Sequence, residues 1–185
     1  MLAQTGLRGS VVIGNDDHVA LDADIAIEAE LKAQAFYAQA AVWVQDPHGR
    51  DLLGRLAAFE QHHYQKLTEL VRSLQAEGQF IAYQPHTIDQ FEPLAGGALP
   101  EEKAPAGMEN EADILGQAIQ MEKAAGERYR VLGDETVDPA GQTMFRRLAN
   151  EEHQLYDSLS FFGKYGKWSG GVTLRAHNFY KPDPN

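Results

Sequence analysis

Two similar ten-residue stretches decide the fold. RLAAFEQHHY occupies residues 55–64, and RLANEEHQLY occupies residues 147–156. Both contain Arg, Leu, Ala, one Glu and a final Tyr at matching places, and subtracting 55 from 147 gives an offset of 92 residues. The second stretch has Leu155 where the first has His63. The question is therefore whether one motif is present twice, with one histidine missing from the second copy.

The same offset extends well beyond the two stretches. Applied outward from them, it keeps Glu, Tyr and the turn residues in register without a gap. In the first copy Ala26, Ile27, Glu30, Ala33, Tyr37, Asp46, Pro47 and Gly49 match Ala118, Ile119, Glu122, Ala125, Tyr129, Asp138, Pro139 and Gly141 in the second. Chance matches scatter over many offsets, whereas a single fixed offset indicates an internal repeat. The chain is therefore predicted to contain one structural unit twice.

Each copy is predicted to form two helices joined by a short turn. Residues 20–45 are rich in alanine and contain few residues that end a helix. Asp46 then precedes Pro47, the usual signature of a helix start, and Asp138 before Pro139 repeats it. Apolar residues at spacings of three and four form one stripe on a helix. The second helix has Leu52, Leu56, Phe59, Glu60, His63, Tyr64, Leu67 and Leu70 on its stripe, and the fourth repeats it with Phe145, Leu148, Ala149, Glu152, Leu155, Tyr156, Leu159 and Phe162.

The order of these segments predicts an all-α fold, namely a ferritin-like four-helix bundle made of two repeated helix hairpins with a long crossover. The whole chain is expected to be one domain, with a first hairpin at residues 20–77 and a second at residues 110–163. Residues 78–109 are rich in Gly and Pro and suit a crossover, and Asn110 is expected to cap the third helix. The tail at residues 164–185 is aromatic and basic, which would suit docking on the bundle or on a second subunit.

Composition excludes several classes of function. The chain of 185 residues has 27 acidic and 16 basic residues, and its net charge of −11 would repel phosphate backbones, so nucleic acid is not an expected partner. The absence of cysteine excludes disulfides, thiolate metal sites and iron–sulfur clusters. No apolar run approaches the roughly 20 residues that span a membrane. The first residues lack the apolar centre of a secretory signal. We therefore expect a soluble, cytoplasmic protein.

Four glutamates are expected to point into the core. Glu30 and Glu122 lie on the apolar stripes of the first and third helices, and Glu60 and Glu152 on those of the second and fourth. Burying an ionised carboxylate costs several kcal/mol, whereas a whole domain is stable by only about 5–15 kcal/mol. No Lys or Arg lies on these stripes, so the acids must share protons, meet cations or bind metal. His63 lies one turn after Glu60 and completes a donor set that suits iron or manganese.

These motifs resemble the rubrerythrin branch of the ferritin-like di-iron carboxylate proteins. That family has a single Glu on each of two helices and a Glu-x-x-His on each of the other two. ELKAQAFY from Glu30 and EKAAGERY from Glu122 are similar to the single-Glu helices, and EQHH from Glu60 matches the Glu-x-x-His pattern. The resemblance covers roughly residues 20 to 163. The fourth helix departs from it, because EHQL from Glu152 ends in Leu155.

The resemblance implies two iron ions, or manganese or zinc, with Glu60 and Glu152 as bridging ligands and Glu30 and Glu122 as terminal ones. Such proteins activate O₂ or peroxide, oxidise ferrous iron or store it. Fe²⁺ or an external electron donor is the implied partner, because the chain lacks the cysteines of a rubredoxin-like module. We also expect a homodimer or a higher homo-oligomer. The alternative function is a non-catalytic metal-binding or interaction bundle whose di-iron site has become degenerate.

Leu155 is expected to make the two metal positions unequal. One position has His63 as a neutral donor, and the other has only carboxylates and water. The second position should then bind metal more weakly, and Leu155→His should strengthen it. An alternative alignment of the fourth helix makes His153 the ligand, with Asn150 in place of its Glu, but it breaks the 92-residue offset.

The remaining polar residues near these motifs receive simpler interpretations. Tyr37 and Tyr129 follow Glu30 and Glu122 by seven residues and are expected either to fill core space or to support the chemistry by hydrogen bonds to the carboxylates. His62 lies about 100° around the helix from the ligand face and is expected to be peripheral. Solvated helix faces are expected for Glu28, Glu69, Glu127 and Glu151.

Overall fold

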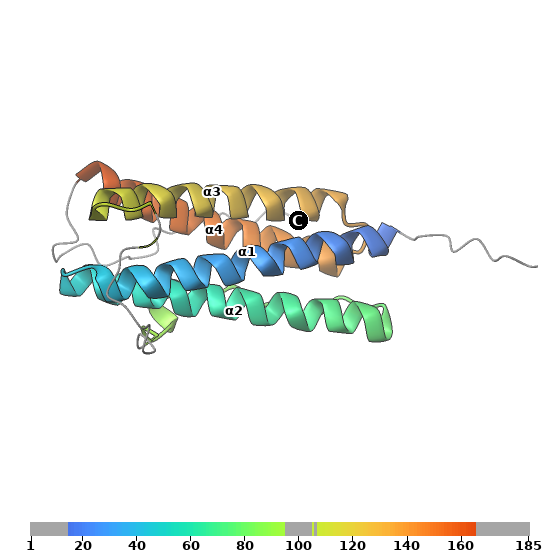
Figure 1. Ribbon diagram of the computed structural model, residues 1–185. Helices are drawn as coiled ribbons and strands as arrows, with labels where there is room; N and C mark the ends of the chain where they lie inside the picture. The colour runs from blue at the N-terminus through green and yellow to red at the C-terminus, as the bar shows by residue number, and fades with distance from the viewer. Residues whose placement is uncertain (1–14, 95–104, 106, 166–185) are drawn as a thin grey trace, which may run out of the picture.

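A computed structural model describes residues 15–94, 105 and 107–165 of the chain (Figure 1). These residues form four α-helices and a short 3₁₀ helix, and no strand is present among them. The helices are α1 (Asn15–Trp43), α2 (Pro47–Glu77), α3 (Glu111–Glu135) and α4 (Pro139–Tyr165), with η1 (Ile88–Gln90) between α2 and α3. The all-α prediction is confirmed. Residues 166–185, which make up most of the predicted tail, lie outside the described part of the chain.

The four helices pack as two antiparallel pairs. Helix α1 packs along α2 and α3 along α4, and the two pairs meet where α1 contacts α3 (Figure 1). Between residues 15 and 43 there is no Gly or Pro to interrupt α1, which begins earlier than the predicted residue 20. None of the helices in the described residues combines the length and apolar character that a bilayer crossing requires.

The predicted helix starts are confirmed by their capping hydrogen bonds. The Asp46 carboxylate accepts from the backbone N–H groups of His48 and Gly49, with Pro47 in the first turn of α2. Asp138 makes the equivalent bonds at the start of α4. The Asn110 side chain accepts from the backbone N–H of Asp113 and caps α3. Each cap satisfies backbone donors that a helix start would otherwise leave without partners.

Two apolar clusters fill the core, and the buried glutamates lie between them. The first cluster is built around Tyr37, Ala40, Val44, Leu53, Leu56, Phe59, Ile88, Ile114, Leu155 and Leu159. The second is built around Ala26, Leu67, Leu70, Tyr83, Tyr129, Leu132, Met144, Phe145 and Leu148. Because apolar side chains cover both ends of the glutamate layer, the carboxylates are removed from water along the axis of the bundle.

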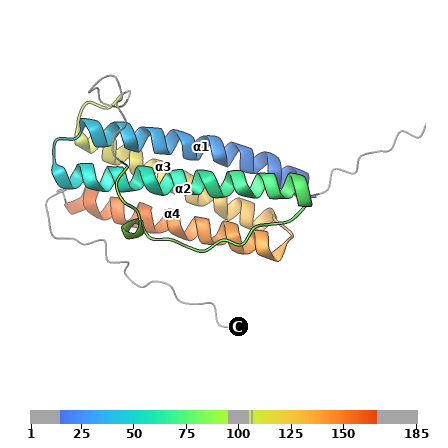
Figure 2. The ribbon, with the colours of Figure 1, turned by 90° about the horizontal axis from the view of Figure 1, so that it is seen from below.

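The first part of the crossover, residues 78–94, runs back along the bundle beside α2 and α4 (Figure 2). It is bound to both helices by hydrogen bonds to its backbone. The backbone N–H of Leu94 donates to the carbonyl of Gly54 at 3.0 Å, and Nη1 of Arg55 donates to the carbonyl of Phe91 at 2.6 Å. On the other side, Arg147 of α4 donates to the carbonyl of Tyr83. Residues 78–94 are therefore fixed against both α2 and α4.

Gly54 allows the crossover to approach α2 closely, and Gly54→Ala should destabilise the fold. A Cβ atom at this position would lie 2.8 Å from Cβ of Pro93 and 3.3 Å from its Cα, so the crossover backbone would have to move. We expect the free energy of unfolding to fall by roughly 1–2 kcal/mol in urea denaturation, because overpacking outweighs the gain in helix propensity. Gly116→Ala is the matched control, since nothing lies within 4 Å of its added Cβ, and it should raise the stability by about 0.5–1 kcal/mol. Equal effects at the two positions would contradict the close approach.

Candidate metal centre

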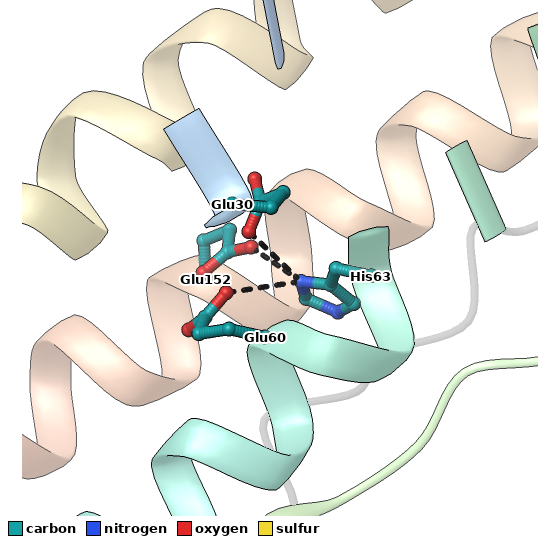
Figure 3. Close-up of side chains that lie close together, drawn as sticks. All are labelled: Glu30, Glu60, His63 and Glu152. Atoms are coloured by element: carbon teal, nitrogen blue, oxygen red, sulfur yellow. Dashed lines mark ion pairs between the residues drawn. The ribbon is translucent and has the colours of Figure 1, made fainter. Parts of the chain in front are cut away.

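Four buried side chains from three helices meet at the middle of the bundle (Figure 3). They are Glu30 of α1, Glu60 and His63 of α2, and Glu152 of α4, and one ligand atom of each lies within 4.8 Å of the others. Nδ1 of His63 is 2.8 Å from Oε1 of Glu152 and 3.7 Å from Oε2 of Glu60. It is 3.9 Å from Oε2 of Glu30. The three carboxylates therefore converge on one imidazole nitrogen.

Glu122 is also buried, and a pair of crossed hydrogen bonds links α1, which carries Glu30, to α3, which carries Glu122. The hydroxyl of Tyr37 on α1 donates to Glu122 on α3, and the hydroxyl of Tyr129 on α3 donates to Glu30 on α1. Both tyrosines are fully buried. Each repeat therefore supplies the phenol that satisfies the single carboxylate of the other repeat. The tyrosines fill core space and bind the carboxylates as well.

Like charges in a dry environment dominate the electrostatics of the cluster. Burial, followed by the charges of neighbouring carboxylates, raises the pKa of Glu60 and Glu122 well above the ordinary value. Burial also raises the pKa of Glu30. Burial would raise the pKa of Glu152 too, but the adjacent His63 lowers it. Conversely, burial disfavours the charged imidazole, yet Glu152 and Glu151 raise the pKa of His63 well above its ordinary value. Burial and mutual repulsion therefore favour the protonated forms of Glu60 and Glu122.

The donor atoms fit a divalent metal ion. Oε1 of Glu60, both carboxylate oxygens of Glu152 and Nδ1 of His63 are buried and make no well-aligned hydrogen bond, although Nδ1 of His63 lies 2.8 Å from Oε1 of Glu152. Such atoms are costly to leave unsatisfied in a core. A cation with oxygen and nitrogen ligands would satisfy all of them, and mixed carboxylate and imidazole sites suit iron, manganese or zinc. The described cluster therefore could hold a metal ion.

Glu151 is not on a solvated face, and this expectation was wrong. Its side chain is buried, and its carboxylate accepts from the hydroxyl of Tyr83 and from the backbone N–H of His86, both in the crossover. Its Oε2 also lies 3.2 Å from Nε2 of His63. The helical stripe could not show this, because much of the buried surroundings of Glu151 comes from the crossover, in addition to His63 of α2. The adjacency of Glu151 to Glu152 was the only signal in the sequence.

His62 lies beside the cluster, not in it. Its ring is half-buried and packs edge-on against the ring of His86 in the crossover, with centroids 4.3 Å apart. Burial, followed by the charges of His86 and His63, lowers the pKa of His62 to about 4.

The expectation of exposed positions is confirmed for three glutamates on the helix surfaces. Glu28, Glu69 and Glu127 are exposed, and they pair with Lys32, Lys66 and Arg130.

The alternative in which His153 is the ligand is wrong. The side chain of His153 is 69% exposed, and its Nε2 lies 3.5 Å from Oδ2 of Asp157 on the outer surface of α4. Asn150 is exposed as well. Leu155 is buried in the first apolar cluster, at the place that the 92-residue offset assigns to it. The predicted orientation of α4, with Leu155 toward the core and His153 outward, is therefore correct. No histidine of α4 enters the cluster.

Comparison with known proteins supports the fold. No protein-family model matches the chain, and no curated protein does. Among solved structures, a hypothetical protein from Pyrococcus furiosus is similar, with a TM-score of 0.60 and 21% sequence identity, covering 82% of this chain and 91% of that one. At this level of identity the similarity concerns the fold alone.

The metal-free protein should lose stability as the pH rises from about 5 to 8. A carboxyl whose pKa is raised in the folded state contributes stability that is fully present below its unfolded pKa, near 4.5, and is lost as the pH rises through the folded pKa. Glu60 and Glu122 act in this way, and the raised pKa of His63 acts in the same direction. The lowered pKa of Glu152 affects the stability only at more acidic pH, below its ordinary value of 4.5.

Thermal unfolding midpoints, measured across this range in the presence of a chelator, test the prediction. Glu60→Gln should flatten the pH dependence, because it removes one of the crowded carboxyl groups. The control Glu28→Gln should leave the dependence unchanged, since that side chain is 69% exposed and pairs with Lys32. A midpoint in the parent protein that does not change with pH would argue against convergence of the acids.

Proposed function

We propose that this protein is a ferritin-like carboxylate bundle of the rubrerythrin type that binds iron and either oxidises Fe²⁺ or activates O₂ or peroxide. One observation carries the proposal, namely three carboxylates and one imidazole that converge in a dry core, where atoms of Glu60, Glu152 and His63 are buried without a hydrogen bond. The resemblance of the sequence motifs to the rubrerythrin branch favours iron over manganese and zinc. It also implies a second metal position near Glu122.

The side chains of the centre have distinct roles in this proposal. Glu60 and Glu152 would hold metal jointly, with Glu30 and His63 completing the first position. Bound iron would supply the exchange of electrons with O₂ or peroxide. Tyr37 and Tyr129 hold Glu122 and Glu30 in place by hydrogen bonds, and the two apolar clusters exclude water from the donors. Because the chain has no cysteine, electrons would come from Fe²⁺ or from an external donor.

A second candidate function is metal binding without catalysis. Leu155 is buried where the related motif has its second histidine, and this substitution favours a bundle that keeps its acids but has a reduced site. Consumption of O₂ or peroxide in the presence of Fe²⁺ separates the two candidates. Binding with turnover supports the oxidoreductase, and binding without turnover supports the non-catalytic bundle.

Removing either shared carboxylate should abolish tight metal binding. Glu60→Ala and Glu152→Ala each take away a donor that no neighbouring side chain replaces, so the metal content of the purified protein should fall below one ion per chain. Elemental analysis and anaerobic Fe²⁺ titration measure this, with circular dichroism to confirm the helical fold. Glu28→Ala is the matched control, because it removes an exposed glutamate and should bind metal like the parent. Unchanged stoichiometry in both core variants would remove this cluster from consideration.

A further inference from the structure

Two positions differ together when the repeats are compared through the 92-residue offset. His63 matches Leu155, and because 151 − 92 = 59, Glu151 matches Phe59. In the structure His63 lies against Glu151, with Nε2 3.2 Å from Oε2. Leu155 and Phe59 both belong to the first apolar cluster. The pair His63 and Glu151 is therefore an imidazole with its carboxylate. The pair at the equivalent positions, Leu155 and Phe59, consists of two apolar side chains.

The crossover follows the same division. Tyr83 and the backbone N–H of His86 donate to Glu151, so polar groups of the crossover cover the His63 side. Further along, the ring of Phe91 packs edge-on against Phe59 with centroids 5.2 Å apart, so an apolar group covers Phe59. The Phe59 ring also packs edge-on against His63, with centroids 4.6 Å apart. The crossover thus meets Glu151 with polar groups and Phe59 with an apolar ring. A single chance loss of the histidine at position 155 would change neither Phe59 nor the crossover.

We propose that Glu151 is the positioning residue that makes His63 a metal ligand, and that Phe59 and Leu155 together limit the centre to one tightly held metal ion. This inference rests on the proposed function. A carboxylate that accepts the Nε2 proton fixes both the tautomer and the direction of the ring, and it leaves the lone pair on Nδ1. Nδ1 is the atom that faces Glu30, Glu60 and Glu152.

The same reasoning changes the expectation for Leu155→His. An imidazole introduced at this position would lie in the cluster that contains Phe59, and Phe59, which stands at the place equivalent to Glu151, cannot accept its second N–H. A buried ring with an unsatisfied donor is costly and has no fixed orientation. The single substitution should therefore leave the metal stoichiometry at one, whereas Phe59→Glu combined with Leu155→His should restore the second position.

Titration of the metal-free full chain with Co²⁺, followed by its visible absorption, tests the role of Glu151. The parent should bind one Co²⁺ tightly, and Glu151→Ala should weaken this binding about 10–100-fold and change the Co²⁺ spectrum. Glu151→Gln keeps an oxygen that can accept from Nε2 and should restore most of the affinity. Glu127→Ala, on the exposed surface of α3, is the control and should bind like the parent. An unchanged affinity and spectrum in Glu151→Ala would overturn the proposal.

Stoichiometry in the same titration tests the apolar side. The expected result is one Co²⁺ for Leu155→His and two for the double variant with Phe59→Glu. Two equally tight ions in the parent or in Leu155→His would overturn the inference and leave the proposed function standing. A parent that binds no Co²⁺ or Fe²⁺ would instead overturn the proposed function. If circular dichroism shows that the double variant does not fold, the proposal is tested by two other results. These are the Co²⁺ stoichiometry of the parent and the Co²⁺ affinity and spectrum of the Glu151 variants.

Discussion

The convergence of buried carboxylates on one imidazole is the constraint on which the rest of the structure depends. Each ionised acid costs several kcal/mol to bury, so the cluster is compatible with a folded domain only if every charge is shared, neutralised or bound. Protons, His63 and the two crossed tyrosine hydroxyls offset part of this cost in the metal-free chain. A cation would satisfy the atoms that remain without partners. Stability and the proposed function therefore depend on the same side chains.

The sequence predicted the features that repeat with helical spacing. Glu152 and Leu155 could be placed because they lie on the stripe of α4, and Asp46 and Asn110 could be placed because caps depend on a few adjacent residues. The preference for Leu155 over His153 followed from the same spacing, and the exposed position of His153 agrees with it. These predictions succeeded because they depend on the geometry of one helix and on one offset.

Glu151 could not be predicted in this way. Its burial depends on where the crossover lies, and its partners Tyr83 and His86 are separated from it by 68 and 65 residues in sequence. The crossover has no periodic pattern in its sequence from which its path could be predicted. Single contacts, such as the close approach of Pro93 to Gly54, hold it in place. Tertiary contacts of an irregular segment are therefore what single-sequence reasoning missed.

The crossover also gives a physical reason for the unequal halves of the centre. Two repeated hairpins need only one connection, so equivalent positions of the two repeats cannot have equivalent surroundings. Glu151 meets the polar part of the crossover, and Phe59 meets Phe91. A carboxylate at position 59 would be buried beside an aromatic ring without the donors that Glu151 receives, and a histidine at 155 would then lack its acceptor. The single connection thus favours one polar and one apolar half, and the asymmetry of the donors follows from the topology of the chain.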